Sequence, residues 1–168
     1  KVGAPSPSTR QFGTAAQRKK AEKVLIGIID VQGFDFSHPD FLNARGKTRF
    51  VRIWDQAGTT RPSPKGSKQF AYGSEFHQEH LNAALTAAPK FKIAPYELEP
   101  QSQMVPGSHG THVASIAAGD HGVCSNAMLA GVLISLSRPD QDRRQSFYDS
   151  TRIADAVDYL IHVADELS

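Results

Sequence analysis

The chain has little cysteine, little tryptophan and no long apolar run. Its 168 residues include a single cysteine, Cys124, and a single tryptophan. One cysteine cannot form an internal disulfide, so the sequence leaves the redox compartment open. No stretch approaches the roughly 20 consecutive apolar residues that a membrane-spanning helix needs, so we expect no membrane anchor in these residues.

The chain also lacks a strong charge of one sign. Its formal net charge of +2 is too small to indicate a nucleic-acid partner. A basic cluster at Arg18, Lys19, Lys20 and Lys23 is interpreted as a solvated face, since nucleic-acid binding there would require strongly salt-dependent affinity. The apolar share of 39% is sufficient for the core of one ordinary domain.

A starting methionine and a signal-peptide core are missing as well. The first residue is Lys1, and the opening segment is rich in Pro, Ser and Gly. We therefore expect that the beginning was removed or that the chain is part of a longer protein. Residues 1–23 are predicted to form a leader or linker that includes a short helix near residues 14–23. Residues 24–168 are predicted to belong to one domain.

Three apolar runs predict strands. Residues 24–29 are apolar throughout and rich in β-branched side chains, which is typical of a strand buried on both faces of a parallel sheet. Residues 49–54 predict a second and more exposed strand, because arginines alternate with large apolar side chains. Trp54 and Phe50 are expected in the core or in a cleft wall. Residues 128–136 predict a third strand.

Three helical patterns separate these strands. Ser74 is expected to cap a helix over residues 75–88, with Pro89 beyond its end. Residues 109–118 consist mostly of small and apolar residues, which predicts a helix that is packed on all sides. A third, amphipathic helix is expected from Ser150 or Thr151 onward. The alternation predicts an α/β fold of three layers with a mostly parallel central sheet.

Two residues are candidates for chemistry. Asp30 directly follows the first apolar run, so it is expected at the carboxyl end of a central strand, where α/β folds form active-site crevices. His109 begins the small-residue helix, and Gly110 beside it leaves room for another backbone. We predict that Asp30 accepts a hydrogen bond from one ring nitrogen of His109, which would leave the other nitrogen free as a general base. A structural pair that only holds a loop to a helix is the alternative.

Other polar residues receive structural interpretations. Asp35 and Asp40 are predicted to form turns, and His112 is expected to pack in its helix and bond to backbone. His77 and His80 have a spacing that allows metal binding, but a solvated helix face is the favoured interpretation. Cys124 is expected to be a buried, inert thiol.

Together these residues resemble the motifs of subtilisin-like serine proteases, the subtilases. Ile28–Ile29–Asp30, Gly33–Phe34–Asp35 and His38–Pro39–Asp40 resemble the aspartate motif of the family. His109–Gly110–Thr111–His112–Val113–Ala114 is similar to the histidine motif, whose first histidine is catalytic. Residues 122–130 are similar to the lead into the next strand. The order Asp, His and then Ser is the order found in subtilisin.

The resemblance implies a serine endopeptidase, with residues 24–168 as the N-terminal part of its catalytic domain. The chain departs from the family pattern at Val31–Gln32–Gly33, which holds one extra residue, and at Ser115, which replaces a glycine. The segment between Asp55 and Pro106 is long. No nucleophile motif of the type GTS.A.P is present, so we expect the catalytic serine on a segment downstream of Ser168 and predict that this chain alone is inactive.

The resemblance also implies partners and cofactors. We expect a polypeptide substrate that pairs with edge strands, with residues 135–147 bordering its groove, and the remaining C-terminal part of the domain as a partner. No cofactor is expected to be required, structural calcium is compatible with the family, and secretion is favoured. An apolar strand edge left unpaired would aggregate or pair with a second chain. The alternative function is a non-catalytic pseudoprotease or docking module, one half of a nicked or truncated subtilase.

Overall fold

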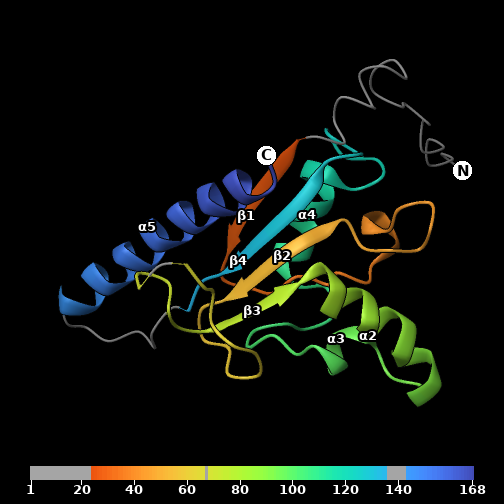
Figure 1. The fold of residues 1–168 in the computed structure, drawn as a ribbon, viewed down its shortest axis with the longest axis horizontal. Coiled ribbons are helices and arrows are strands. Elements are labelled where there is room, and N and C mark those ends of the chain that lie inside the picture. The colour runs from red at the N-terminus through yellow and green to blue at the C-terminus, as the bar shows by residue number, and fades with distance from the viewer. Residues whose placement is uncertain (1–23, 67, 136–142) are drawn as a thin grey trace, which may run out of the picture.

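A computed structural model describes residues 24–66, 68–135 and 143–168, with side chains of the last segment described from residue 151. The predicted leader at residues 1–23 lies outside the described residues, as does most of the expected groove segment. One four-stranded sheet forms the centre of the fold (Figure 1), and its strand order is β1-β4-β2-β3. The strands are β1 (Leu25–Asp30), β2 (Phe50–Asp55), β3 (Ser74–His77) and β4 (Met128–Leu133).

The sheet is mostly parallel, as predicted. β4 pairs in parallel with β1 on one side and with β2 on the other, whereas β3 pairs antiparallel to β2. Asp30 and Asp55 both lie beside Leu133, so the last residues of three strands meet at one edge of the sheet. That edge is where ligand crevices form in α/β folds.

Helices cover both faces of the sheet. α2 (Gln78–Phe91) and α4 (His109–Ala118) contribute to a core that includes Phe34, Phe50 and Leu129. α5 (Arg143–Glu166) covers the opposite face, where Tyr159 packs against Trp54. The predicted three layers are therefore present, with short turns at η1 (Pro39–Phe41) and α3 (Pro95–Leu98).

Strand β2 is more buried than its sequence predicts. Five of its six residues are buried, because β2 lies between β4 and β3. Phe50 and Trp54 are both fully buried, which confirms their assignment to the core. The interleaved Arg52 reaches the sheet surface and forms ion pairs with Glu75 and Glu166 instead of lying in solvent.

The segment around Ser74 differs from its prediction. Residues 74–77 form β3, in which Ser74 and Phe76 point inward and pair with β2, so the expected helix begins later, at Gln78. His77 takes the N-cap position, and Pro89 lies inside the last turns of α2. Lys92, in the left-handed conformation with φ of 56°, ends the helix.

Two other helices also differ in detail from their predictions. α5 begins at Arg143, before the expected Ser150 or Thr151. α4 is not packed on all sides by the described residues, since His112 is exposed and Ile116 is 71% exposed. α4 contacts β1, β4 and η1. Within the described parts of the chain, no helix is long and apolar enough to cross a membrane.

Candidate active site

Strand β1 carries Asp30 to the carboxyl edge of the sheet. Asp30 is the last residue of the strand and pairs with Leu133 of β4. Its side chain is 5% exposed. The backbone N–H of Gln32 donates to Asp30 Oδ1 over 2.9 Å, which satisfies one oxygen of the buried carboxylate.

The start of α4 carries His109 to the same edge. Ser108 occupies the N-cap position, but its hydroxyl donates to the carbonyl of Gly33 over 2.6 Å and does not cap the helix. The backbone N–H of His109 donates instead to Oε1 of Gln32 over 2.7 Å. The first turn of α4 is thus bonded directly to the loop that follows β1.

Asp30 and His109 are in contact, as predicted. Nδ1 of His109 lies 2.7 Å from Oδ2 of Asp30. The imidazole is 67% exposed, and its Nε2 makes no hydrogen bond within the described residues. A buried carboxylate that bonds one ring nitrogen and leaves the other accessible is an arrangement suited to general-base chemistry.

Gly110 allows this close approach. A Cβ atom at this position would lie 2.3 Å from the carbonyl oxygen of Gln32 and 2.9 Å from that of Gly33. Both neighbours are backbone atoms, which cannot move away by a rotamer change as a flexible side chain can. The predicted approach of another backbone to Gly110 is therefore confirmed.

The loop that precedes α4 is hydrogen-bonded to the aspartate motif. Gln101 is 7% exposed and forms two hydrogen bonds of 2.8 Å with the backbone N–H and C=O of Phe34. The backbone N–H of Gly33 donates to the carbonyl of Gln103 over 3.1 Å. Sequence reasoning did not find this support, because a glutamine in a long loop carries no motif.

The remaining residues of the aspartate motif have structural roles. Asp35 Oδ1 accepts from the backbone N–H of Ser37 over 3.0 Å, which confirms the predicted turn. Asp40 accepts from the hydroxyl of Ser115, so the residue that departs from the family pattern bonds η1 to α4. Cys124 is half-buried and packs against the core, and is thus more exposed than expected.

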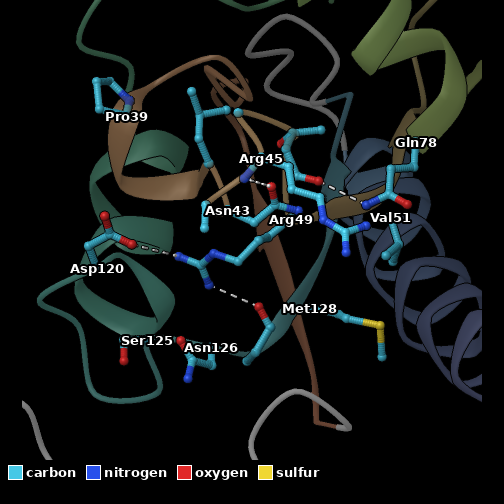
Figure 2. A pocket seen from close by; sticks show the side chains of 15 residues that line it. Pro39, Asn43, Arg45, Arg49, Val51, Gln78, Asp120, Ser125, Asn126 and Met128 are labelled. Atoms are coloured by element: carbon cyan, nitrogen blue, oxygen red, sulfur yellow. Dashed lines mark hydrogen bonds and ion pairs between the residues drawn. The ribbon is translucent and has the colours of Figure 1, made fainter. Parts of the chain in front are cut away.

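A buried arginine holds the opposite end of α4 (Figure 2). The guanidinium of Arg49 donates to the carbonyls of Asp40, Ala118 and Ala127 over 2.6, 2.6 and 2.9 Å. Figure 2 shows the guanidinium beside Asp120. Its side chain is 10% exposed and lies 3.8 Å from the carboxylate of Asp120. Burial lowers the pKa of Arg49, whereas the nearby carboxylates oppose that effect. Ala118 is the last residue of α4, where a cation interacts favourably with the helix dipole.

Replacing Arg49 with methionine should lower the free energy of unfolding by about 3 kcal/mol, because three carbonyls, two of them in buried residues, lose their donor. Arg49→Lys is the matched control and should recover only part of the loss, since an ammonium group cannot reproduce the planar fork. Chemical denaturation at pH 7 measures both. A loss below about 1 kcal/mol for the methionine variant would contradict this role.

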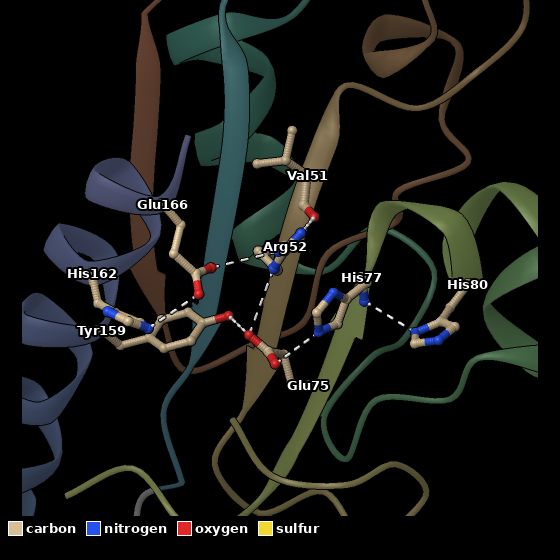
Figure 3. Close-up of polar contacts among 8 residues, drawn as sticks. All are labelled: Val51, Arg52, Glu75, His77, His80, Tyr159, His162 and Glu166. Atoms are coloured by element: carbon tan, nitrogen blue, oxygen red, sulfur yellow. Dashed lines mark hydrogen bonds and ion pairs between the residues drawn. The ribbon is translucent and has the colours of Figure 1, made fainter. Parts of the chain in front are cut away.

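A second polar cluster joins β2, β3 and α5 (Figure 3). Glu75 accepts from the hydroxyl of Tyr159 over 2.8 Å and bonds Nε2 of His77 over 2.8 Å. Arg52 lies 3.7 Å from Glu75 and 3.6 Å from Glu166. Burial and the adjacent Glu75 raise the pKa of Tyr159 well above its usual value, so the phenol stays protonated.

His77 and His80 belong to this cluster, whereas the sequence favoured a solvated helix face. Nδ1 of His80 accepts from the backbone N–H of His77 over 3.2 Å, and both residues are half-buried. Among the residues that the structure describes, no group of three or more His, Cys, Asp or Glu side chains is arranged to hold a metal ion.

Acidification should destabilise the fold through His80. Burial lowers the pKa of His80, and Arg61 lowers it further, so the unfolded chain takes up the proton first. The stability from neutral His80 is present above the ordinary histidine pKa of about 6.5 and is lost as the pH falls through the lowered value. His80→Asn keeps an acceptor for His77 but does not titrate. Denaturation at pH 7 and pH 5 should therefore show a smaller loss for this variant, and equal losses would contradict the prediction.

Comparisons with known proteins identify the family and a similar fold. A model of the subtilase family matches residues 21–164. Among solved structures, the chain is similar to the CspB protease of Clostridium perfringens, with a TM-score of 0.63 and 25% sequence identity. The similarity covers 88% of this chain and 27% of that protease. The search of curated proteins found no match. The chain belongs to the subtilase family of serine proteases.

Proposed function

We propose that the full-length protein is a serine endopeptidase and that this chain supplies Asp30 and His109 of its catalytic triad. The observation that supports the proposal is the 2.7 Å contact between His109 Nδ1 and the buried carboxylate of Asp30. The contact lies at the carboxyl edge of a parallel sheet, in a chain of the subtilase family.

In this reaction His109 acts as a general base and then as a general acid. Its Nε2 removes the proton from a serine hydroxyl as the serine oxygen attacks the carbonyl carbon of a peptide bond. Asp30 holds the ring with Nδ1 protonated and stabilises the imidazolium that forms. Nε2 then donates the proton to the leaving amine, and water hydrolyses the acyl-enzyme by the same two proton transfers.

The proposed serine lies on a segment downstream of Ser168. The free edge of β1 supports this placement, because within the described residues β1 pairs only with β4. An unpaired edge on a strand of apolar sequence favours the addition of a further strand.

The helices on both faces of the sheet contact β1 and carry exposed apolar side chains. On α5, Leu160 lies over Gly27 of β1, and the adjoining Ile153, Val157 and Ile161 are each more than 40% exposed. On the opposite face, Ile116 of α4 is 71% exposed. A strand added beside β1, with its connecting helix, would cover apolar surface of this kind, which supports the remaining part of the catalytic domain as the first partner. Membership of the subtilase family supports a polypeptide as the substrate.

Labelling with a serine-directed fluorophosphonate tests the proposal. The full-length protein should be labelled and should cleave peptides, and residues 1–168 alone should do neither. His109→Ala should abolish labelling, whereas His112→Ala should retain it, because His112 is exposed on the same helix and bonds neither Asp30 nor Gln32. Labelling of residues 1–168 alone would show that the nucleophile has been misplaced. An unlabelled and inactive full-length protein would favour the docking-module alternative.

A further inference from the structure

We propose that Gln32 is a positioning residue for His109, a role that rests on the proposed function. The side-chain amide of Gln32 fixes the backbone of the candidate base relative to Asp30. Gln32 stands in the part of the aspartate motif that holds one residue more than the family pattern.

The bonds between Gln32, Asp30 and His109 form a closed ring. The backbone N–H of Gln32 donates to Oδ1 of Asp30 over 2.9 Å, and its side-chain Oε1 accepts from the backbone N–H of His109 over 2.7 Å. Nδ1 of His109 completes the ring at Oδ2 of Asp30, over 2.7 Å. One residue thus contacts both members of the pair, through two different groups.

The helix start needs such an acceptor. His109 is the first residue of α4, where the backbone N–H has no partner within the helix. An N-cap side chain accepts from the second or third helical N–H and not from the first. The hydroxyl of Ser108 also bonds the carbonyl of Gly33 and lies 2.9 Å from Oγ1 of Thr111. Gln32, 77 positions earlier in the chain, provides the acceptor.

Packing alone does not hold the imidazole in place. The ring is 67% exposed, so its position depends on the Asp30 bond and on the backbone that carries it. Gln32 and Gly33 approach Gly110 closely enough that a Cβ there would contact their carbonyls, which brings the glutamine side chain within reach of the His109 amide. Loss of the amide bond would widen the range of ring positions, and a misplacement of about 1 Å can reduce a rate about 10²-fold.

A matched pair of variants tests the role in the full-length protein. Gln32→Met keeps the length of the side chain and the backbone N–H but removes the acceptor, whereas Gln32→Glu keeps an acceptor. We expect Gln32→Met to lower kcat about tenfold with KM changed less than about twofold, and Gln32→Glu to restore most of the activity. Val31→Ala, at the neighbouring exposed residue, should have no effect on kcat.

A spectroscopic measurement separates this role from the proposed function. The Nδ1 proton shared with Asp30 should give a low-field proton resonance, which should broaden or vanish in Gln32→Met and persist in Gln32→Glu. This result in a protein without peptidase activity would uphold the positioning role and overturn the proposed function. Unchanged kcat and resonance in Gln32→Met, or equal impairment of both variants, would overturn the positioning role.

Discussion

Replacing Asp30 with asparagine should lower kcat of the full-length protein about 10⁴-fold, the loss seen when the corresponding group of a serine protease triad is changed to an amide. The introduced carboxamide would satisfy the backbone N–H of Gln32 with its oxygen and would therefore present its NH₂ group to Nδ1 of His109. The ring would then carry its proton on Nε2. In that tautomer Nε2 cannot remove a proton from the serine.

Asp35→Asn is the matched control for this substitution. Asp35 lies in the same motif and accepts from Ser37, but it bonds neither His109 nor Gln32. Its amide variant should retain kcat within about threefold. Steady-state kinetics on a peptide substrate, with a denaturation curve for each variant, measures the difference. A loss below tenfold for the Asp30 variant would make Asp30 a structural residue that only anchors the helix.

Gly110→Ala should lower both stability and activity, although alanine is the better helix former. Helix propensity alone predicts a gain of up to about 1 kcal/mol. The added Cβ would instead lie 2.3 Å from the carbonyl of Gln32, so α4 must move away from the loop after β1. We expect a loss of about 3 kcal/mol in the free energy of unfolding and a fall in kcat of about 10²-fold as His109 shifts from Asp30.

Gly27→Ala is the control for Gly110→Ala. It tests whether crowding against a flexible side chain has the same effect as crowding against backbone atoms. A Cβ at Gly27 would lie 2.7 Å from Cδ1 of Leu160, the end of a flexible side chain that can rotate. This variant should lose about 1 kcal/mol and retain its kcat, because β1 and α4 need not separate. Chemical denaturation and peptide hydrolysis measure both variants. Equal stability losses, or an unchanged kcat in Gly110→Ala, would show that the contact with Gln32 does not control the site.

The parts of the site that depend on residues adjacent in the sequence could be predicted. An apolar run that ends in an aspartate indicates a buried strand with a carboxylate at its carboxyl end, and His109 before Gly110 indicates a helix start that another backbone approaches. Both inferences depend on neighbouring residues, and the contact between Asp30 and His109 confirms them.

The surroundings of the site were not predictable, because their partners lie far apart in the chain. Gln32 bonds a residue 77 positions away, and Gln101 bonds Phe34 across 67 positions. A single glutamine carries no sequence signal that tells whether it lies free in a loop or bonds a distant part of the chain. Only the folded backbone decides which of its possible partners it meets.

The sequence by itself determined the alternation of strands and helices and the placement of Asp30 and His109 at their ends, since hydrophobic runs and small-residue patterns are local properties. Tertiary structure alone decided that β2 is enclosed between two strands, that residues 74–77 form a strand before the helix, and that Arg52 pairs with Glu75. These outcomes depend on which strand lies next to which. Strand pairing is a long-range choice that local propensity does not encode.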